Sequence, residues 1–212
     1  MSFVSLLLVV VSGLSWSLVY LDCIRTGFRQ KTFCMPLFPL ALNLSWEGLY
    51  SYADLFVRHS VSAQALANAC WFCLDVCILI TWFRFGKEEV SSSLERKLFV
   101  PWTILVVVVS FVLQILFLHE FGSVEGEKYS AFLQNIVMSV AFLDLLKQRK
   151  STRGQTMAIA VLKCVGTVTP TILGTMEGNL FILVTGIICF VFDVLYIVFL
   201  HLVRNRSIQI GK

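Results

Sequence analysis

The most regular feature of the sequence is the alternation of long apolar runs with short polar stretches. A helix needs about 20 apolar residues to cross a bilayer, and seven runs of roughly that length occur along the chain. We expect helices near residues 2–21, 33–57, 61–83, 99–118, 129–146, 155–176 and 180–203. Short connections favour one bundle of sequential neighbours. The pattern therefore predicts a single all-α integral membrane domain of seven transmembrane helices over residues 1–212.

The composition agrees with a membrane protein. Of the 212 residues, 58% are hydrophobic and 14% are charged, more apolar surface than a water-soluble domain of this size needs. The net charge of +4 is not a signal for nucleic acid. The seven cysteines lie in or beside apolar segments, so we interpret them as packing residues and not as a disulfide framework.

The basic residues predict an orientation, because cytoplasmic loops of membrane proteins carry an excess of Lys and Arg. Of the 17 Lys and Arg residues, 14 fall on the side of the C-terminus, two fall on the other side, and Lys163 lies inside a helix. This places the N-terminus outside or in the lumen and the C-terminus in the cytoplasm. The uncharged first segment is expected to be a retained helix of a multi-pass protein, in the endoplasmic reticulum if fungal and the plasma membrane if bacterial.

One apolar segment contains a carboxylate, Glu47, that is energetically unfavourable inside a bilayer. An ionisable side chain at the middle of the membrane costs about 2.5–3.5 kcal/mol and is a functional-site hypothesis by default. Asn43, Glu47, Tyr50 and Asp54 are spaced i, i+4, i+7 and i+11, so they share one helix face. We expect that face to point inward.

Two more acids lie deep in apolar segments. Asp75 shares a stripe with Asn68 and Trp71, and Asp193 precedes Tyr196 by three residues. Lys163 is the one buried base, so at least one of the three acids is expected to lack a cation and to be protonated, because burial disfavours the charged form. A neutral carboxyl group in a dry cavity is a Brønsted acid suited to an epoxide or an alkene. The structural alternative is an acid that pairs with Lys163 and locks the bundle.

The aromatic residues on these helix faces have two possible roles. Their rings stabilise cations in a site beside acids, or they pack and form an interfacial belt. They are Trp16, Tyr20, Trp46, Tyr50, Trp71, Phe72, Phe190 and Tyr196. Other chemistry has little support, because the Cys70, Cys73 and Cys77 group has no nearby His and the sequence has no phosphate-binding glycine loop. We expect no metal and no cofactor.

Several segments together resemble a known family, the pyripyropene cyclase-like membrane-integral terpene cyclases. The resemblance is carried by residues 13–17 with Tyr20, 31–35, 40–43, Trp46-Glu47-x-x-Tyr50, 130–133, and 186–190 with Asp193 and Tyr196. The Asn-x-x-Trp-Glu-x-x-Tyr element, together with the late Asp-x-x-Tyr, is the more specific part. Three departures occur. Asp75 stands where relatives are expected to carry a neutral polar residue, Gln134 and Asn135 lie where some members carry an acid nearby, and Lys163 replaces an arginine.

The resemblance implies a seven-helix enzyme of meroterpenoid or indole-diterpene biosynthesis. Such enzymes protonate the terminal epoxide or alkene of a prenyl chain on an aromatic, polyketide or indole unit, and they direct a class II-like polyene cyclisation without a metal. The acids on which the family depends match Glu47 and Asp193. We expect the substrate to be contacted by Asn43, Trp46, Tyr50, Trp71, Asp75 and Tyr196, with Asp75 lining the cavity or pairing with Lys163.

The implied partners are a hydrophobic prenylated substrate, the lipid bilayer, and a prenyltransferase and an epoxidase of the same pathway. Two other classes of function stay open from the residues. A small proton-coupled transporter would use the inward acids as a relay, although such proteins often show two related halves that are not found here. A non-enzymatic seven-helix scaffold or receptor would carry recognition surface in its loops, which are short.

Overall fold

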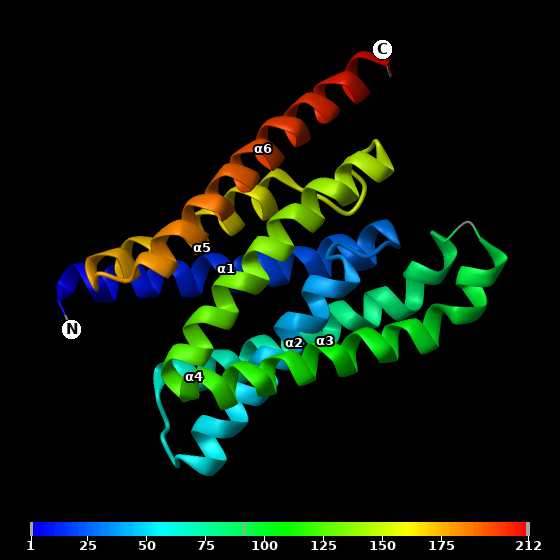
Figure 1. Ribbon diagram of the computed structural model, residues 1–212. Coiled ribbons are helices and arrows are strands. Elements are labelled where there is room, and N and C mark those ends of the chain that lie inside the picture. Colours follow the sequence, from blue (N-terminus) through cyan, green and yellow to red (C-terminus); the bar gives the residue numbers. More distant parts are fainter. Residues whose placement is uncertain (1, 91, 211–212) are drawn as a thin grey trace.

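The computed structural model describes residues 2–90 and 92–210, and these fold almost entirely into helices (Figure 1). The elements are α1 (Phe3–Gln30), α2 (Leu37–Tyr52), the π-helical turn η1 (Ala53–Val57), α3 (Ala63–Phe85), the short 3₁₀ turn η2 (Gly86–Glu88), α4 (Ser93–Arg149), α5 (Met157–Met176) and α6 (Leu180–Ile210). The all-α prediction is confirmed. Lys212, one of the basic residues used for the orientation, lies outside the described residues.

Hydroxyl side chains start three of the helices. The side chains of Ser2, Ser62 and Thr156 accept hydrogen bonds from the backbone N–H three residues later, which satisfies one of the free donors at a helix N-terminus. Pro36 occupies the corresponding position before α2, in an extended conformation. These boundaries follow from local chemistry that the sequence contains.

Helix α1 runs nine residues beyond the predicted end at residue 21. Its extension carries Arg25 and Arg29 on the exposed side, whereas Cys23, Thr26 and Gly27 are buried. An amphipathic turn can therefore continue the helix past the apolar run. Lys31, in the left-handed conformation at φ 52°, ends it.

The largest difference from the predicted helices lies in α4. The expected fourth and fifth helices form one element of 57 residues, broken only at Gly122, where φ is 74° and ψ is 178°. This backbone conformation is essentially restricted to glycine. Figure 1 shows two arms, residues 93–121 and 123–149, that diverge sharply from this point. Gln114 on the first arm donates to Gln134 on the second over 3.0 Å.

Within residues 2–90 and 92–210, five helices are long and apolar enough to cross a membrane: α1, α4, α5, the stretch Ala63–Glu88 that begins with α3, and Leu180–Arg206 of α6. Helix α2 has 16 residues and is prolonged directly by η1. Many large apolar side chains point outward, including Leu105 and Val108 of α4, which suits a lipid environment. The protein is an integral membrane protein.

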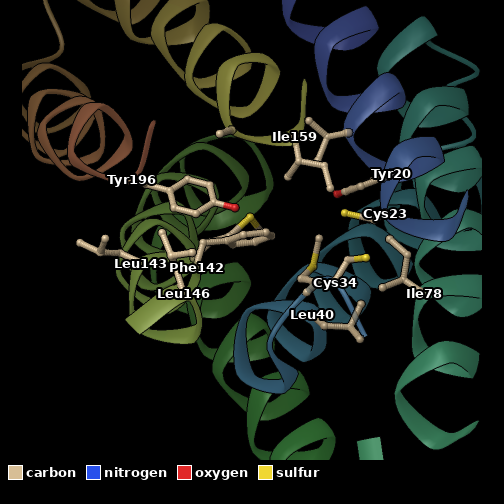
Figure 2. Close-up of a cluster of buried hydrophobic side chains, with 14 of the residues drawn as sticks. Tyr20, Cys23, Cys34, Leu40, Ile78, Phe142, Leu143, Leu146, Ile159 and Tyr196 are labelled. Atoms are coloured by element: carbon tan, nitrogen blue, oxygen red, sulfur yellow. The ribbon is translucent and has the colours of Figure 1, made fainter. Parts of the chain in front are cut away.

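The helices form two groups. Helices α1, α5 and α6 lie together on one side, and α2, α3 and the first arm of α4 lie on the other, with α1 also contacting α3 and α4 also contacting α6 (Figure 1). One apolar cluster fills the space between the groups (Figure 2). Its members include Tyr20, Cys23, Leu40, Phe142, Leu146, Ile159 and Tyr196. The cysteines are free thiols; Cys70 and Cys73 are exposed on α3, whereas Cys23, Cys34, Cys164 and Cys189 are buried as packing residues.

Candidate active site

Glu47 is the centre of a buried hydrogen-bond chain between α1 and α2. Glu47 is only 1% exposed. The Tyr20 hydroxyl donates to Glu47 Oε1 over 2.6 Å, and Asn43 Nδ2 donates to the Tyr20 hydroxyl over 2.7 Å. Asn43 and Glu47 are four residues apart on α2, so both side chains reach the same ring on α1. The chain of donors fixes the direction of the hydrogen bonds and orients the carboxyl group.

Asp75 reaches the same place from α3. It is fully buried, and its carboxyl group lies close enough to that of Glu47 for the two groups to interact electrostatically. Apart from this interaction, no hydrogen-bond partner for either Asp75 oxygen or for Glu47 Oε2 occurs in the described part of the chain. The prediction that Asp75 pairs with Lys163 is wrong, because Lys163 binds another acid. Two carboxyl groups from neighbouring helices therefore face each other inside the protein.

The third acid, Asp193, forms a separate cluster in the other helix group. Lys163 Nζ of α5 donates to Asp193 Oδ1 of α6 over 2.5 Å and to Ser139 Oγ on the second arm of α4 over 2.6 Å. Lys163 and Ser139 are fully buried, and Asp193 is 1% exposed. A buried, hydrogen-bonded ion pair keeps both groups charged and joins three helices. Asp193 is therefore an ion-paired carboxylate, whereas Glu47 contacts Tyr20 and Asp75.

The apolar cluster lies between the two polar clusters. Figure 2 shows Tyr20 and Tyr196 on opposite sides of it, with both hydroxyl groups directed toward its middle. The Tyr196 ring packs edge-on against Phe142 at 5.7 Å between centroids, and its hydroxyl is buried without a hydrogen-bond partner among the described residues. Cys23 and Cys34 lie between the two tyrosines (Figure 2). Glu47 and Asp193 thus belong to polar clusters on either side of one apolar region.

The remaining predicted site residues divide between this region and α4. Trp71 is half-buried beside the hydrogen-bonded cluster of Glu47, Tyr20 and Asn43. Its ring centroid lies 6.4 Å from that of Tyr20, and its indole N–H donates to Ser17 Oγ. Trp46 instead donates to the backbone carbonyl of Glu127 on α4 over 3.0 Å. Its ring is tilted against that of Tyr50 at 5.6 Å between centroids, and Tyr50 is fully buried against the bend of α4.

Sequence reasoning missed two residues that hold the acids. Tyr20 appeared only as an aromatic residue, and nothing in the local pattern indicates that it hydrogen-bonds an acid 27 positions later. Ser139, which binds Lys163, gave no signal because serine is a common helix-packing residue in membranes. Both contacts depend on how distant helices pack.

A surface groove of about 530 Å³ lies between the second arm of α4 and α6. Its lining is Ile136, Val137, Val140, Ala141, Leu143, Asp144, Lys147 and Phe192, which is apolar except at one end. Leu143 belongs both to this groove and to the apolar cluster between the acids. The groove is therefore open at the protein surface and shares a wall with the interior.

Comparison with known proteins gives the family. The model of the Pyr4-like transmembrane terpene cyclases matches residues 1–206. The chain belongs to this family, and the resemblance inferred from its motifs is confirmed. Cyclisation of terpenoids is the activity of the family, which favours the membrane enzyme over the transporter and the receptor.

Three curated relatives are similar to this chain, two of them named terpene cyclases and one named a synthase. The Pyr4-family terpene cyclase mfmH of Annulohypoxylon moriforme is 28% identical over 163 residues, covering 76% of this chain and 66% of that protein. Terpene cyclase pyr4 of Aspergillus fumigatus is 25% identical over 218 residues, covering 93% and 86%. Asnovolin H synthase nvfL of Aspergillus novofumigatus is 26% identical over 166 residues, covering 75% and 65%. The matched part thus spans most of pyr4 and slightly less than two thirds of mfmH and nvfL.

Proposed function

We propose that this chain cyclises the prenyl tail of a meroterpenoid precursor by protonating its end. The substrate is a farnesyl or geranylgeranyl chain on an aromatic, polyketide or indole unit, with a terminal epoxide or alkene. The observation that carries the proposal is the environment of Glu47. It is a buried carboxyl group, oriented by the Tyr20 and Asn43 hydrogen bonds and not bound to the buried lysine.

The proposed first step is a proton transfer from Glu47. Its O–H bond breaks, the proton bonds to the epoxide oxygen or to the terminal alkene carbon, and the electron pair stays on the Glu47 carboxylate. The epoxide C–O bond opens toward a tertiary cation, which the next alkenes of the folded tail attack in turn. A basic group or a bound solvent molecule accepts a proton from the last cation, which ends the reaction, and the Glu47 carboxylate takes up a proton before the next turnover. The proton of the carboxyl group serves as the initiating acid, so the proposed step needs no metal or cofactor.

The surroundings of Glu47 support cation chemistry. Trp16 and Trp71 flank Tyr20, with ring centroids 6.1 and 6.4 Å from its own. Ring faces attract cations, and a water-free interior protects them from being quenched. The apolar cluster beyond Tyr20 is the region where we place the folded tail.

The ion pair of Asp193 supports a different role for the second family acid. Bound to Lys163, the carboxylate is already satisfied by a cation and is a poor proton donor. We assign Asp193 to holding α5, α6 and the second arm of α4 together on the far side of the site. Its negative charge also favours cations in the adjoining apolar region.

Seven crossings remain the proposed topology. The arms of α4 are counted as two of them, and α2 with η1 as one, so that the N-terminus is outside or lumenal and the C-terminus is cytoplasmic. The bend at Gly122 supports this count, because it reverses the direction of the chain within α4. The proposed membrane is the endoplasmic reticulum if the source is fungal and the plasma membrane if it is bacterial.

The groove between α4 and α6 is the proposed route by which the prenyl tail leaves the lipid for the interior. Its apolar lining matches a hydrocarbon chain, and Leu143 belongs both to the groove and to the apolar cluster. A prenyltransferase would make the prenylated precursor, and an epoxidase would oxidise it before it reaches this route.

A product assay tests the function. Membranes that contain the protein are incubated with prenyl-aromatic substrates, epoxidised and not, and membranes from cells without the gene serve as the control. Cyclisation is an isomerisation, so we expect a product of unchanged mass and new retention time, with fewer alkenes by NMR. Absence of any isomer from either substrate type, across farnesyl and geranylgeranyl chains and with folded protein, would contradict the proposal.

A further inference from the structure

The least explained feature of the interior is the contact between the carboxyl groups of Glu47 and Asp75. Both side chains are buried, one from α2 and the other from α3. They face each other, and both Asp75 oxygens and Glu47 Oε2 lack any other hydrogen-bond partner in the described residues. Two ionised carboxylates in contact repel each other strongly, and burial increases the cost of each charge.

Among the described residues, no cation lies beside the pair to relieve this repulsion. The ionisable groups that face the pair are Tyr20 and Cys23, both from α1, which are neutral when protonated. Lys163 is bound to Asp193 and Ser139 in the other helix group. At least one proton must therefore reside on the pair.

The hydrogen-bond directions assign that proton to one side of Glu47. The Tyr20 oxygen accepts from Asn43 Nδ2, and its single hydrogen is donated to Glu47 Oε1. Glu47 Oε1 is thus an acceptor. The other oxygen, Oε2, has no other hydrogen-bond partner in the described residues, and it is the oxygen that we place toward Asp75. A proton on Oε2 donates to Asp75, and a proton on Asp75 donates to Oε2, so the two states exchange along one hydrogen bond.

We propose that Glu47 and Asp75 form a carboxyl pair that shares the initiating proton, with Asp75 as the positioning residue that keeps this proton on the pair. This inference rests on the proposed function for its catalytic meaning, but the pair itself is a property of the resting protein. Asp75 acts through Glu47. The remaining acid near this face, Glu127 of α4, is engaged by Asn68 on α3 and lies outside the pair.

Infrared spectroscopy tests the pair without a substrate. A protonated carboxyl group has a carbonyl stretch distinct from those of ionised carboxylates and amides, and the band shifts in D₂O. We expect the purified wild-type protein to show such a band at neutral pH. The variants Glu47→Gln and Asp75→Asn should each remove or shift that same band, because each changes the hydrogen-bond partner of the other residue. Glu177→Gln, at an exposed acid, is the matched control and should leave the band unchanged.

The cyclisation rate of Asp75→Asn tests whether Asp75 acts in the reaction. Removing Asp75 leaves Glu47 beside an amide that stabilises the ionised carboxylate, so Glu47 is less often protonated and we expect Asp75→Asn to lose at least about 10-fold in cyclisation rate. The deficit should shrink under acidic assay conditions and grow under alkaline ones. A purely structural role would lower the rate equally at every pH and would appear as a loss of folded protein.

The outcomes separate the two proposals. A wild-type protein without a protonated-carboxyl band at neutral pH, or an Asp75→Asn variant with the wild-type band, would overturn the shared proton. An Asp75→Asn variant with a pH-independent deficit would overturn the positioning role. If the band behaves as expected but no substrate is cyclised, the pair stands and the proposed function fails.

Discussion

The buried ion pair of Lys163 and Asp193 gives a prediction whose size can be worked from the structure. Asp193→Asn keeps the shape of the side chain but leaves the Lys163 ammonium with neutral partners only, Ser139 Oγ at 2.6 Å and the new amide. Breaking a buried pair from one side typically costs about 3–5 kcal/mol. We therefore expect Asp193→Asn to lower the free energy of unfolding by about 3–5 kcal/mol.

The assay is reversible denaturant unfolding of the purified protein in detergent micelles, followed by far-UV circular dichroism. The control is Glu177→Gln, which removes one partner of the Lys128–Glu177 pair. That pair spans 3.4 Å, and its side chains are 39% and 52% exposed, so solvent screening should limit the loss to less than about 1 kcal/mol. A second variant, Lys163→Met with Asp193→Asn, removes both charges and should recover at least half of the lost stability.

A small effect would refute this reasoning. If Asp193→Asn destabilises the protein no more than Glu177→Gln does, the ion pair does not hold the helices together. If such a stable variant is also inactive as a cyclase, Asp193 acts in the chemistry and not as the structural partner of Lys163. Failure of the double variant to recover stability would show that the loss comes from packing and not from an unpaired charge.

Three further predictions concern the Tyr20 hydroxyl, the bend at Gly122 and the membrane topology. Tyr20→Phe removes the hydroxyl that donates to Glu47 over 2.6 Å, so it should slow cyclisation about 10-fold and cost about 1–2 kcal/mol of stability; an unchanged rate would exclude Tyr20 from orienting the acid. Gly122→Ala places a Cβ on a backbone at φ 74° and should lower the free energy of unfolding by about 1–3 kcal/mol. Gly13→Ala is the control and should be neutral or stabilising, because a Cβ there has an ordinary contact at 4.0 Å with its nearest neighbour. A reporter fused at Gly154 should read cytoplasmic and an N-terminal one lumenal; both on one side would contradict seven crossings.

The helices were predictable wherever a long apolar run set their length. The run alone misplaced the end of α1, because the residues after Leu21 form an amphipathic continuation with Arg25 outward and Cys23 inward. It also predicted a loop between residues 118 and 129, which the structure reduces to one non-helical residue, Gly122. Hydropathy measures burial in lipid and not backbone geometry, so it detects apolar segments better than the turns that join them.

The candidate site was predictable as a set of acids but not as a set of contacts. Spacing places Glu47 and Tyr50 on one helix face, yet Glu47 meets Tyr20 of α1 whereas Tyr50 packs against α4. Helix α2 is buried on several sides, so a helical wheel cannot choose among its neighbours. The partner of Lys163 likewise depended on the packing of α5 against α6, which favours Asp193 over Asp75.

The most direct test of Glu47 as the proton donor is the cyclisation rate of Glu47→Gln in membranes where the variant is as abundant and as stable as the wild type. The amide keeps the size of the side chain and can still accept the Tyr20 hydrogen bond, but it has no proton to transfer. Positioned acid catalysis is typically worth about 10²–10⁴-fold. We expect product formation to fall by at least about 100-fold, to near the level of membranes without the protein. A folded Glu47→Gln variant that cyclises at the wild-type rate would contradict the role of Glu47.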